Sequence, residues 1–358
     1  AAPVVAAVQA MLCGDMHEPL QSGLGIEFEV SDGASDLAGV SAALAAVTLE
    51  AVQGAFGHRL PRAELLACLE RISKWPSLEP GGTRLLLAAM EAQPGRLTQL
   101  RRQPQHVAGQ IELPAGLIVA AVEVFPRRPI RRERVVESQI AAMMGHRMIV
   151  ELADAGIGKP PAAYAFLADV TTADFVDHFR DRIPQRISGR EYLDLFGPLP
   201  NETMTIDPDH AYRPRSRVEH HIYEHQRVQD VMAHLIRAAN ANDDGPLTKA
   251  AELIYASHWS HSQRFGLGSA ETDFVSQHVR QQGPAKGMFG AKLASGAYGG
   301  LMIVLMRDTP AARNVLNEVV ETAAAQYKSP FRVLTGSDAG AAVIGARPWV
   351  AVASGRVN

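Results

Sequence analysis

The sequence predicts an α+β fold on three observations. Apolar Ile26, Phe28 and Val30 alternate with glutamates, the period-two pattern of a strand with one buried face. Leu117–Val124 is apolar without alternation, as expected of a strand covered on both faces. Helical segments lie between the strands without the regular rhythm of βαβ units, which argues against a doubly wound parallel sheet.

A glycine-containing loop over Ser31–Gly39 precedes the first predicted helix. That helix runs from Ser41, with apolar residues at helical spacing, until Gly57 ends it. A second helix begins at Pro61. A third, short helix is predicted at Leu85–Ala92.

After the apolar strand, the spacing predicts a long amphipathic helix at Arg132–Leu152. The inward positions of that helix are Val135, Val136, Ile140, Met144 and Met148. Further helices are predicted at Thr172–Ile183, Glu219–Ala239, Leu247–Phe265 and Glu271–Gln282.

The C-terminal stretch returns to strands. Phe289–Met306 has the pattern of strand, glycine loop and strand, and Thr309 begins a helix at Pro310–Tyr327. Arg332–Leu334 and Val343–Val352 have strand-like patterns.

Composition excludes several classes of protein. Hydrophobic residues make up 47% and charged residues 20% of the 358 residues, which excludes a disordered or collagen-like chain. The formal net charge of -3 predicts neither a nucleic-acid partner nor a membrane partner. No apolar run reaches the roughly 20 residues that a membrane-spanning helix needs. Cys13 and Cys68 are too few for a disulfide framework, so we expect a cytoplasmic protein.

Two glycine-rich loops are placed where a backbone could approach a phosphate. In the first, Gly39, Val40 and Ser41 start a helix, whose free N–H groups and dipole attract an anion. An ordinary helix cap is the alternative. The second, Gly290–Gly300, lies between apolar strands, and its small residues allow close approach either to a ligand or to another strand.

Together these loops resemble those of the GHMP small-molecule kinases. Gly290-Ala291-Lys292 and the loop after it resemble the third family motif, Gly-Ala-Lys/Arg-x-Thr-Gly-Gly-Gly-x-Gly-Gly, and Ala38–Leu44 resembles a shortened phosphate loop. The similarity is to the galactokinase and L-arabinokinase branch. Other matching stretches keep their order along the chain: residues 110–114, 142–145, 222–228, 258–262, 266–269 and 336–340.

The resemblance implies two α+β domains with nucleotide and sugar in the cleft between them. The N-terminal domain, residues 1–114, would be ribosomal S5 domain 2-like and incomplete at its front, and residues 115–358 would form an α/β-plait-like domain. The implied reaction is phosphorylation of a monosaccharide at the anomeric hydroxyl with ATP and Mg²⁺. Ser41 would contact the Mg²⁺, and the implied nucleotide-binding residues are Gly39, Val40, Ser41, Ser295, Gly296, Gly299 and Gly300.

The chain departs from the family pattern at chemically important positions. Pro80–Leu86 aligns with Pro-Cys-Gly-x-Met-Asp-Gln and puts Leu85 where the family has its proton-accepting Asp; a leucine cannot accept a proton. Arg84 beside it could stabilise phosphoryl charge or be a plain surface residue. One serine of the three in the phosphate loop remains, and the bulky Tyr298 lies inside the third motif.

On the sugar side, Glu123 and Arg127 match in kind the first and fifth residues of the family's Asp-Ser-Gly-Val-Arg-His. The family's first motif has no counterpart near the N-terminus. We therefore expect either a kinase with impaired catalysis or an inactive protein that binds nucleotide, sugar or a protein partner. A fragment, a circular permutation or a tandem copy would explain the absent motif. The identity of the sugar and of any protein partner is not readable.

Two further clusters have competing interpretations. Five arginines at the start of a predicted helix could receive a phosphate, an acidic sugar or an acidic partner, or could be a solvated helix end: Arg127, Arg128, Arg131, Arg132 and Arg134. Five histidines could suggest a metal, but we expect them to be structural: His220, His221, His225, His258 and His261.

Overall fold

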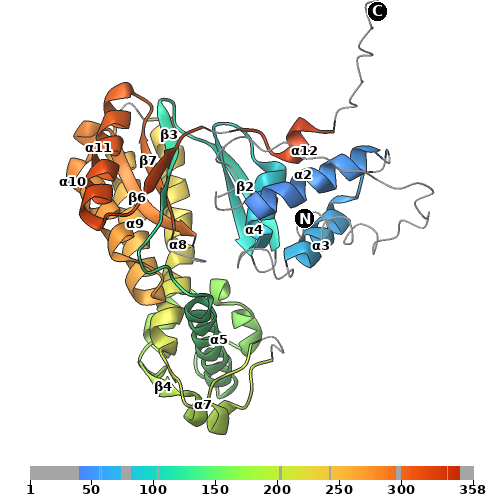
Figure 1. Cartoon of the computed structure of the whole chain (residues 1–358). Coiled ribbons are helices and arrows are strands. Elements are labelled where there is room, and N and C mark those ends of the chain that lie inside the picture. Colours follow the sequence, from blue (N-terminus) through green and yellow to red (C-terminus); the bar gives the residue numbers. More distant parts are fainter. Residues whose placement is uncertain are drawn as a thin grey trace, which may run out of the picture. The chain divides into compact units, whose positions relative to one another are not determined.

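A computed structural model describes residues 40–55, 57, 59–73, 82–102, 105–200, 204–241, 243–295, 300–336 and 338–346. The predicted strand at residues 26–30 and the loop at residues 31–39 lie outside the described residues. The chain divides into two compact units (Figure 1). The first comprises Ala1–Arg102, Val107–Gln110 and Ser337–Asn358, and the second comprises Gln103–His106 and Ile111–Gly336.

The first unit is built on helices whose apolar faces meet in one core. α4 packs on α2, and both α3 and α12 pack on α4. The core includes Ala45, Leu49, Leu69, Leu86 and Met90. The helices are α2 (Val40–Ala55), α3 (Arg62–Ser73), α4 (Gly82–Glu91) and α12 (Ala341–Ile344), and the neighbouring strands are β1 (Arg96–Arg102) and β2 (Gln105–Glu112).

The second unit contains a four-stranded sheet in the order β6-β7-β3-β8. Every neighbouring pair in it is antiparallel, which agrees with the predicted absence of a doubly wound parallel sheet. Helices α9 and α10 pack against β6, and α11 packs against β8 (Figure 1). The strands are β3 (Leu117–Val124), β6 (Met288–Ser295), β7 (Leu301–Arg307) and β8 (Phe331–Leu334).

Helices extend the second unit away from this sheet. α8 packs on α9, and α5 packs on α8. Ile140, Met144 and Met148 of α5 are buried, as their spacing predicts. The helices are α5 (Arg132–Asp154), α8 (Pro214–Ala239), α9 (Gly245–Trp259), α10 (Ala270–Gln282) and α11 (Pro310–Tyr327), with the 3-10 turn η6 (Pro284–Lys286).

A small lobe formed by residues 155–213 packs on α5 and α8 around buried aromatic side chains that include Tyr164, Phe175 and Phe179. The continuous helix predicted at Thr172–Ile183 is wrong in part, because α-helix is confined to Thr172–Asp174 and the next five residues, Phe175–Phe179, form a wide π turn. That turn contributes two buried phenylalanines to the lobe's core. The lobe's elements are η2 (Pro161–Tyr164), η3 (Leu167–Asp169), α6 (Thr172–Asp174), η4 (Phe175–Phe179), β4 (Ile187–Ser188), α7 (Gly189–Phe196) and β5 (Ala211–Tyr212).

Two other predicted elements differ from the structure. The helix predicted at Leu247–Phe265 continues beyond α9 as a π turn, η5 (Ser260–Phe265). The strand predicted at Val343–Val352 is wrong at its start, because α12 ends only at Ile344; residues 347–352 lie outside the described residues. No helix in the described ranges is long and apolar enough to cross a membrane.

Candidate functional site

The first glycine-rich loop leads into α2. Val40 and Ser41 lie in the first turn of this helix, and Gly39 lies outside the described residues. No acidic side chain occupies the turn. An anion would therefore meet the helix N-terminus without a competing carboxylate on the same turn.

The second loop begins at Ser295, the last residue of β6, and ends at Gly300, directly before β7. The Gly300 carbonyl accepts a 2.6 Å hydrogen bond from the Val124 N–H. A Cβ at residue 300 would lie 2.9 Å from the Val124 carbonyl oxygen, so close approach to β3 explains this glycine. The residues between, which include Gly296, Tyr298 and Gly299, lie outside the described residues.

Leu85, at the position where the resemblance expects a catalytic aspartate, lies on α4. Its half-buried side chain packs against the core of the first unit, which includes Ala42 and Leu86. Packing is thus the role that this side chain has in the structure. The side chain of Arg84 lies outside the described part of the chain.

Glu123, a predicted sugar contact, lies near the end of β3. Its side chain is only 6% exposed and forms a 2.8 Å ion pair with Arg332, the residue opposite it on β8. The Arg332 guanidinium also lies 6.0 Å from the centre of the Phe125 ring. A sugar hydroxyl would have to compete with this arginine for the carboxylate.

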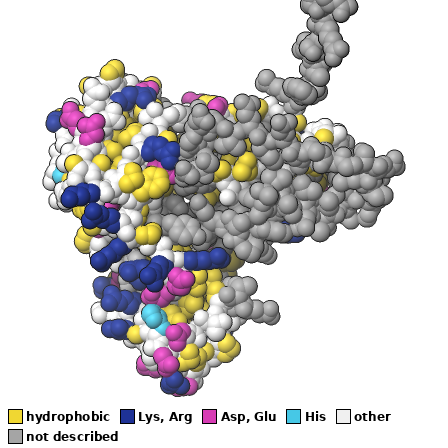
Figure 2. Space-filling view, in the orientation of Figure 1, with side chains coloured by type: hydrophobic (Ala, Val, Ile, Leu, Met, Phe, Trp, Pro, Cys, Tyr) yellow, Lys and Arg dark blue, Asp and Glu magenta, His cyan; other side chains and the backbone are white. Residues whose placement is uncertain are grey.

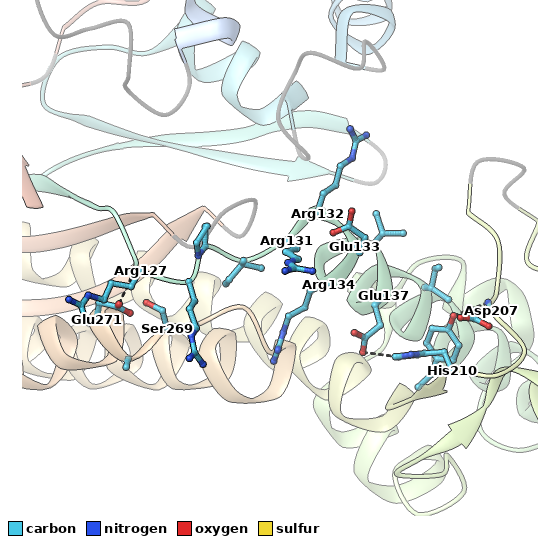
Figure 3. Close-up of a pocket in the computed structure, with 18 residues that line it drawn as sticks. Arg127, Arg131, Arg132, Glu133, Arg134, Glu137, Asp207, His210, Ser269 and Glu271 are labelled. Carbon is cyan, nitrogen blue, oxygen red and sulfur yellow. Dashed lines mark hydrogen bonds and ion pairs between the residues drawn. The ribbon is translucent and has the colours of Figure 1, made fainter. Parts of the chain in front are cut away.

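Arg127, the other predicted sugar contact, lines a pocket of about 980 Å³ in the second unit (Figure 3). The walls come from residues 127–140, 207–212 and 268–271. The Arg127 backbone N–H donates a 3.2 Å hydrogen bond to Oε1 of the buried Glu271. At the other side, His210 lies 3.4 Å from Glu137. Figure 3 shows Arg131 and Arg134 between these two pairs.

All five arginines of the predicted basic cluster line this pocket, and all are exposed. None of them forms an ion pair with a carboxylate in the described residues. The Arg134 Nε donates 2.8 Å to the Gly266 carbonyl, which ties the start of α5 to the segment before α10. Figure 2 shows Lys and Arg side chains gathered in a band across the middle of the second unit.

The stretch at residues 266–269 forms part of the pocket wall, and packing accounts for its composition. A Cβ at Gly266, where φ is +82°, would lie 2.9 Å from Nη2 of Arg217. A Cβ at Gly268 would lie 2.1 Å from the Ser262 hydroxyl. The Ser269 hydroxyl caps α10 by accepting from the Thr272 N–H at 3.2 Å.

Lys292 belongs to a half-buried polar network that sequence reasoning did not find. Its ammonium donates 2.7 Å to Oε1 of Glu224, which also accepts from the Ser257 hydroxyl, and Arg227 pairs with Oε2 at 2.5 Å. Burial alone would raise the Glu224 pKa. The electrostatic effects of Lys292 and His220 and the hydrogen bonds from Lys292 and Ser257 outweigh burial and hold that pKa well below its ordinary value. The signal available in the sequence was that both residues lie in stretches resembling the family.

Two of the candidate metal-binding histidines are held by protein groups. His258 Nδ1 accepts from the Leu293 N–H at 3.1 Å, so its Nε2 carries the proton that points to Asp273 at 3.0 Å. His220 Nδ1 lies 3.0 Å from the Ser260 hydroxyl. No group of three or more His, Cys, Asp or Glu in the described ranges could hold a metal ion.

The sequence is similar to known sugar kinases, although no protein-family model matches it. It is 23% identical to the L-arabinokinase of Arabidopsis thaliana over 358 residues, which cover 90% of this chain and 34% of that protein. It is 28% identical to a galactokinase of Thermotoga petrophila over 119 residues, 33% of this chain and 30% of that protein. The chain thus spans about a third of the length of these curated relatives.

The fold is similar to that of a solved galactokinase. Lactococcus lactis galactokinase complexed with galactose matches with a TM-score of 0.60 and 17% identity, over 85% of this chain and 67% of that one. The predicted α+β class and GHMP kinase fold are confirmed. Sequence and fold together relate this chain to the GHMP kinase superfamily, on its galactokinase and L-arabinokinase side.

Proposed function

We propose that the chain is a sugar-kinase-like protein that binds ATP and a monosaccharide and phosphorylates the anomeric hydroxyl with impaired efficiency. The observation that carries the impairment is Leu85, which packs into the core of the first unit at the position of the expected proton acceptor. Loss of a general base costs roughly 10²–10⁴-fold in rate, whereas positioning of the reactants is retained. The proposal includes a cytoplasmic location, where ATP is available.

The start of α2 fits the phosphates of a nucleotide. Its first turn carries no acidic side chain, and a helix N-terminus presents free N–H groups to an anion. We assign Gly39, Val40 and Ser41 to this role and the Ser41 hydroxyl to Mg²⁺. Bound Mg²⁺ would neutralise phosphate charge during transfer. On the second glycine-rich loop, we assign nucleotide binding to Ser295, Gly296, Gly299 and Gly300.

An inactive protein that still binds its ligands is the second candidate, and Glu123 favours it. With its carboxylate 6% exposed and paired to Arg332, this residue offers little to a sugar hydroxyl. Arg127 would then be the remaining sugar contact of the predicted pair. Loss of both a proton acceptor and a sugar-binding carboxylate would remove turnover while leaving nucleotide binding intact.

Leu85→Asp tests the impaired-kinase proposal, with Leu85→Asn as a control of the same shape that cannot act as a base. Both variants place a polar group at a half-buried position, so we expect both to lose a similar stability, about 1–3 kcal/mol. Measured as ADP release from Mg-ATP over a panel of monosaccharides, Leu85→Asp should exceed both Leu85→Asn and the unaltered protein by roughly 10²-fold.

Other outcomes separate the two candidates. Rapid sugar-dependent turnover by the unaltered protein would show that Leu85 does not impair catalysis. Folded protein that binds ATP but gives no turnover in any of the three forms would support the inactive candidate. Protein that binds neither ATP nor any sugar would contradict both.

A further inference from the structure

The pocket lined by Arg127, Arg128, Arg131, Arg132 and Arg134 has more arginines than carboxylates, and none of the five forms an ion pair in the described residues. Five arginines line it, against four carboxylates, and one of the four, Glu271, accepts a hydrogen bond from the Arg127 N–H. Glu137 lies 3.4 Å from His210 Nε2, which makes no hydrogen bond in the described residues. Guanidinium groups bind carboxylate and phosphate through paired hydrogen bonds. The pocket therefore has free donors of the kind that recognise an acidic group.

The backbone adds to this charge. α5 begins in the pocket wall and is 23 residues long, and the side chain of its N-cap residue, Arg131, makes no capping hydrogen bond. The Arg134 N–H donates to the Arg131 carbonyl at 3.1 Å, and the N-terminal end of the helix carries partial positive charge. Glu133 in the same turn is exposed and forms no ion pair with the five arginines.

A buried guanidinium lies behind the pocket wall. Arg217 is 6% exposed, and its Nη1 donates to the Arg264 carbonyl. Its Nε has no hydrogen-bond partner among the residues that the structure describes. Burial lowers its pKa to about 10; Glu137 opposes this shift, and Arg134 and Arg213 add to it. Glu137 and Arg134 both line the pocket, so the Arg217 guanidinium interacts electrostatically with two groups of the pocket wall.

We infer that this pocket binds the carboxylate or phosphate group of an acidic sugar, so that the acceptor is a sugar acid or sugar phosphate rather than a neutral hexose. The identity of the ligand as an acceptor sugar rests on the proposed function. A volume of about 980 Å³ is that of a small-molecule site. Ser269, Asp207 and His210 at its walls provide polar groups for hydroxyls.

Calorimetric titration of the full chain tests the inference with matched pairs of ligands. D-galacturonate and D-galactose differ in the acidic group at one carbon, and galactose 6-phosphate and inorganic phosphate distinguish a sugar phosphate from a free anion. We expect D-galacturonate or galactose 6-phosphate to bind at least tenfold more tightly than both D-galactose and inorganic phosphate.

Charge-removing variants locate the binding. Arg128→Gln combined with Arg131→Gln should weaken binding of the acidic sugar at least tenfold and leave D-galactose unchanged. Arg237→Gln combined with Lys249→Gln removes the same charge from exposed positions elsewhere in the second unit and should have no effect. All four positions are exposed, so both double variants should fold, which circular dichroism checks.

Several results would overturn the inference. These are affinities of both acidic sugars no higher than that of D-galactose, binding of inorganic phosphate as tight as that of the tighter acidic sugar, displacement of the acidic sugar by ATP, or acidic-sugar binding that the arginine variant leaves unchanged. Turnover of a neutral sugar would sustain the proposed function while removing this inference. Binding of an acidic sugar without turnover in any Leu85 form would sustain this inference and remove the proposed phosphorylation.

Discussion

His220 is a buried ionisable side chain that forms no ion pair with a carboxylate in the part of the chain that the structure describes. Its ring is 4% exposed and lies 4.8 Å from the Phe265 ring in a stacked arrangement, between His221 and His261. Burial is the largest cause that holds the His220 pKa well below its ordinary value of 6.5. The two histidines and Lys292 add to the effect, and Glu224 opposes it.

This arrangement predicts acid sensitivity. Below pH 6.5 the unfolded chain protonates at His220 and the folded protein does not, so the free energy of unfolding should fall by up to about 1.4 kcal/mol per pH unit from this residue. In His220→Gln, the decline between pH 7 and pH 5 should be shallower. Urea unfolding at several pH values measures both slopes.

The pH slope separates titration from packing, although His220→Gln also alters the contact with Phe265. The loss of that contact lowers the free energy of unfolding by a similar amount at every pH, so the comparison of the two slopes excludes it. Parallel slopes for His220→Gln and the unaltered protein would show that His220 titrates alike in the folded and unfolded states.

At the scale of elements, close backbone contact explains why α12 begins where it does. The Gly340 N–H donates 2.8 Å to the Ala92 carbonyl, and a Cβ at residue 340 would lie 2.5 Å from the Met90 carbonyl oxygen. Gly340→Ala should therefore push α12 off α4 and cost about 1–3 kcal/mol. Gly109→Ala in β2, where a Cβ would meet nothing within 4 Å, is the matched control and should change stability little.

Denaturant unfolding of both variants, with hydrogen exchange across residues 82–92, measures the Gly340→Ala effect. We expect the amide hydrogens of α4 to exchange faster in Gly340→Ala and at the unaltered rate in Gly109→Ala. Unchanged exchange and stability would mean that the contact between Gly340 and Met90 relaxes without cost.

Elements with a long, regular pattern were predictable from the sequence, and those set by distant contacts were not. β3 matches its predicted range, and α11 begins after its Thr309 cap as predicted. The apolar residues at 343–344 have the composition of a strand, but contact with α4 determines their helical form. The π turn at residues 175–179 depends on the core of the small lobe and has no signature in local spacing.

The same distinction applies to the candidate site. The basic cluster was visible because its five arginines are neighbours in the sequence. The Lys292–Glu224 pair was not, because its members are 68 residues apart and only the packing of β6 near α8 joins them. Arg332 likewise reaches Glu123 through strand register, which a single sequence does not reveal.

At the scale of the whole molecule, each unit has its own buried core. One core is built from α2, α3 and α4, and another joins α5 and α8 to the small lobe. Units with separate cores can unfold separately. Two variants probe them individually: Gly340→Ala in the first unit, and Lys292→Met in the second. Lys292→Met removes one of the two cations paired with the half-buried Glu224 and leaves Arg227, so it should cost about 1–2 kcal/mol.

Calorimetry should therefore resolve two unfolding transitions, with Gly340→Ala lowering one midpoint and Lys292→Met lowering the other. The double variant should show both shifts, since substitutions that share no partner act additively. Hydrogen exchange at residues 82–91 and 288–295 would assign each transition to its unit. A single transition that both variants lower would contradict separate unfolding, because damage to either core would then destabilise the other.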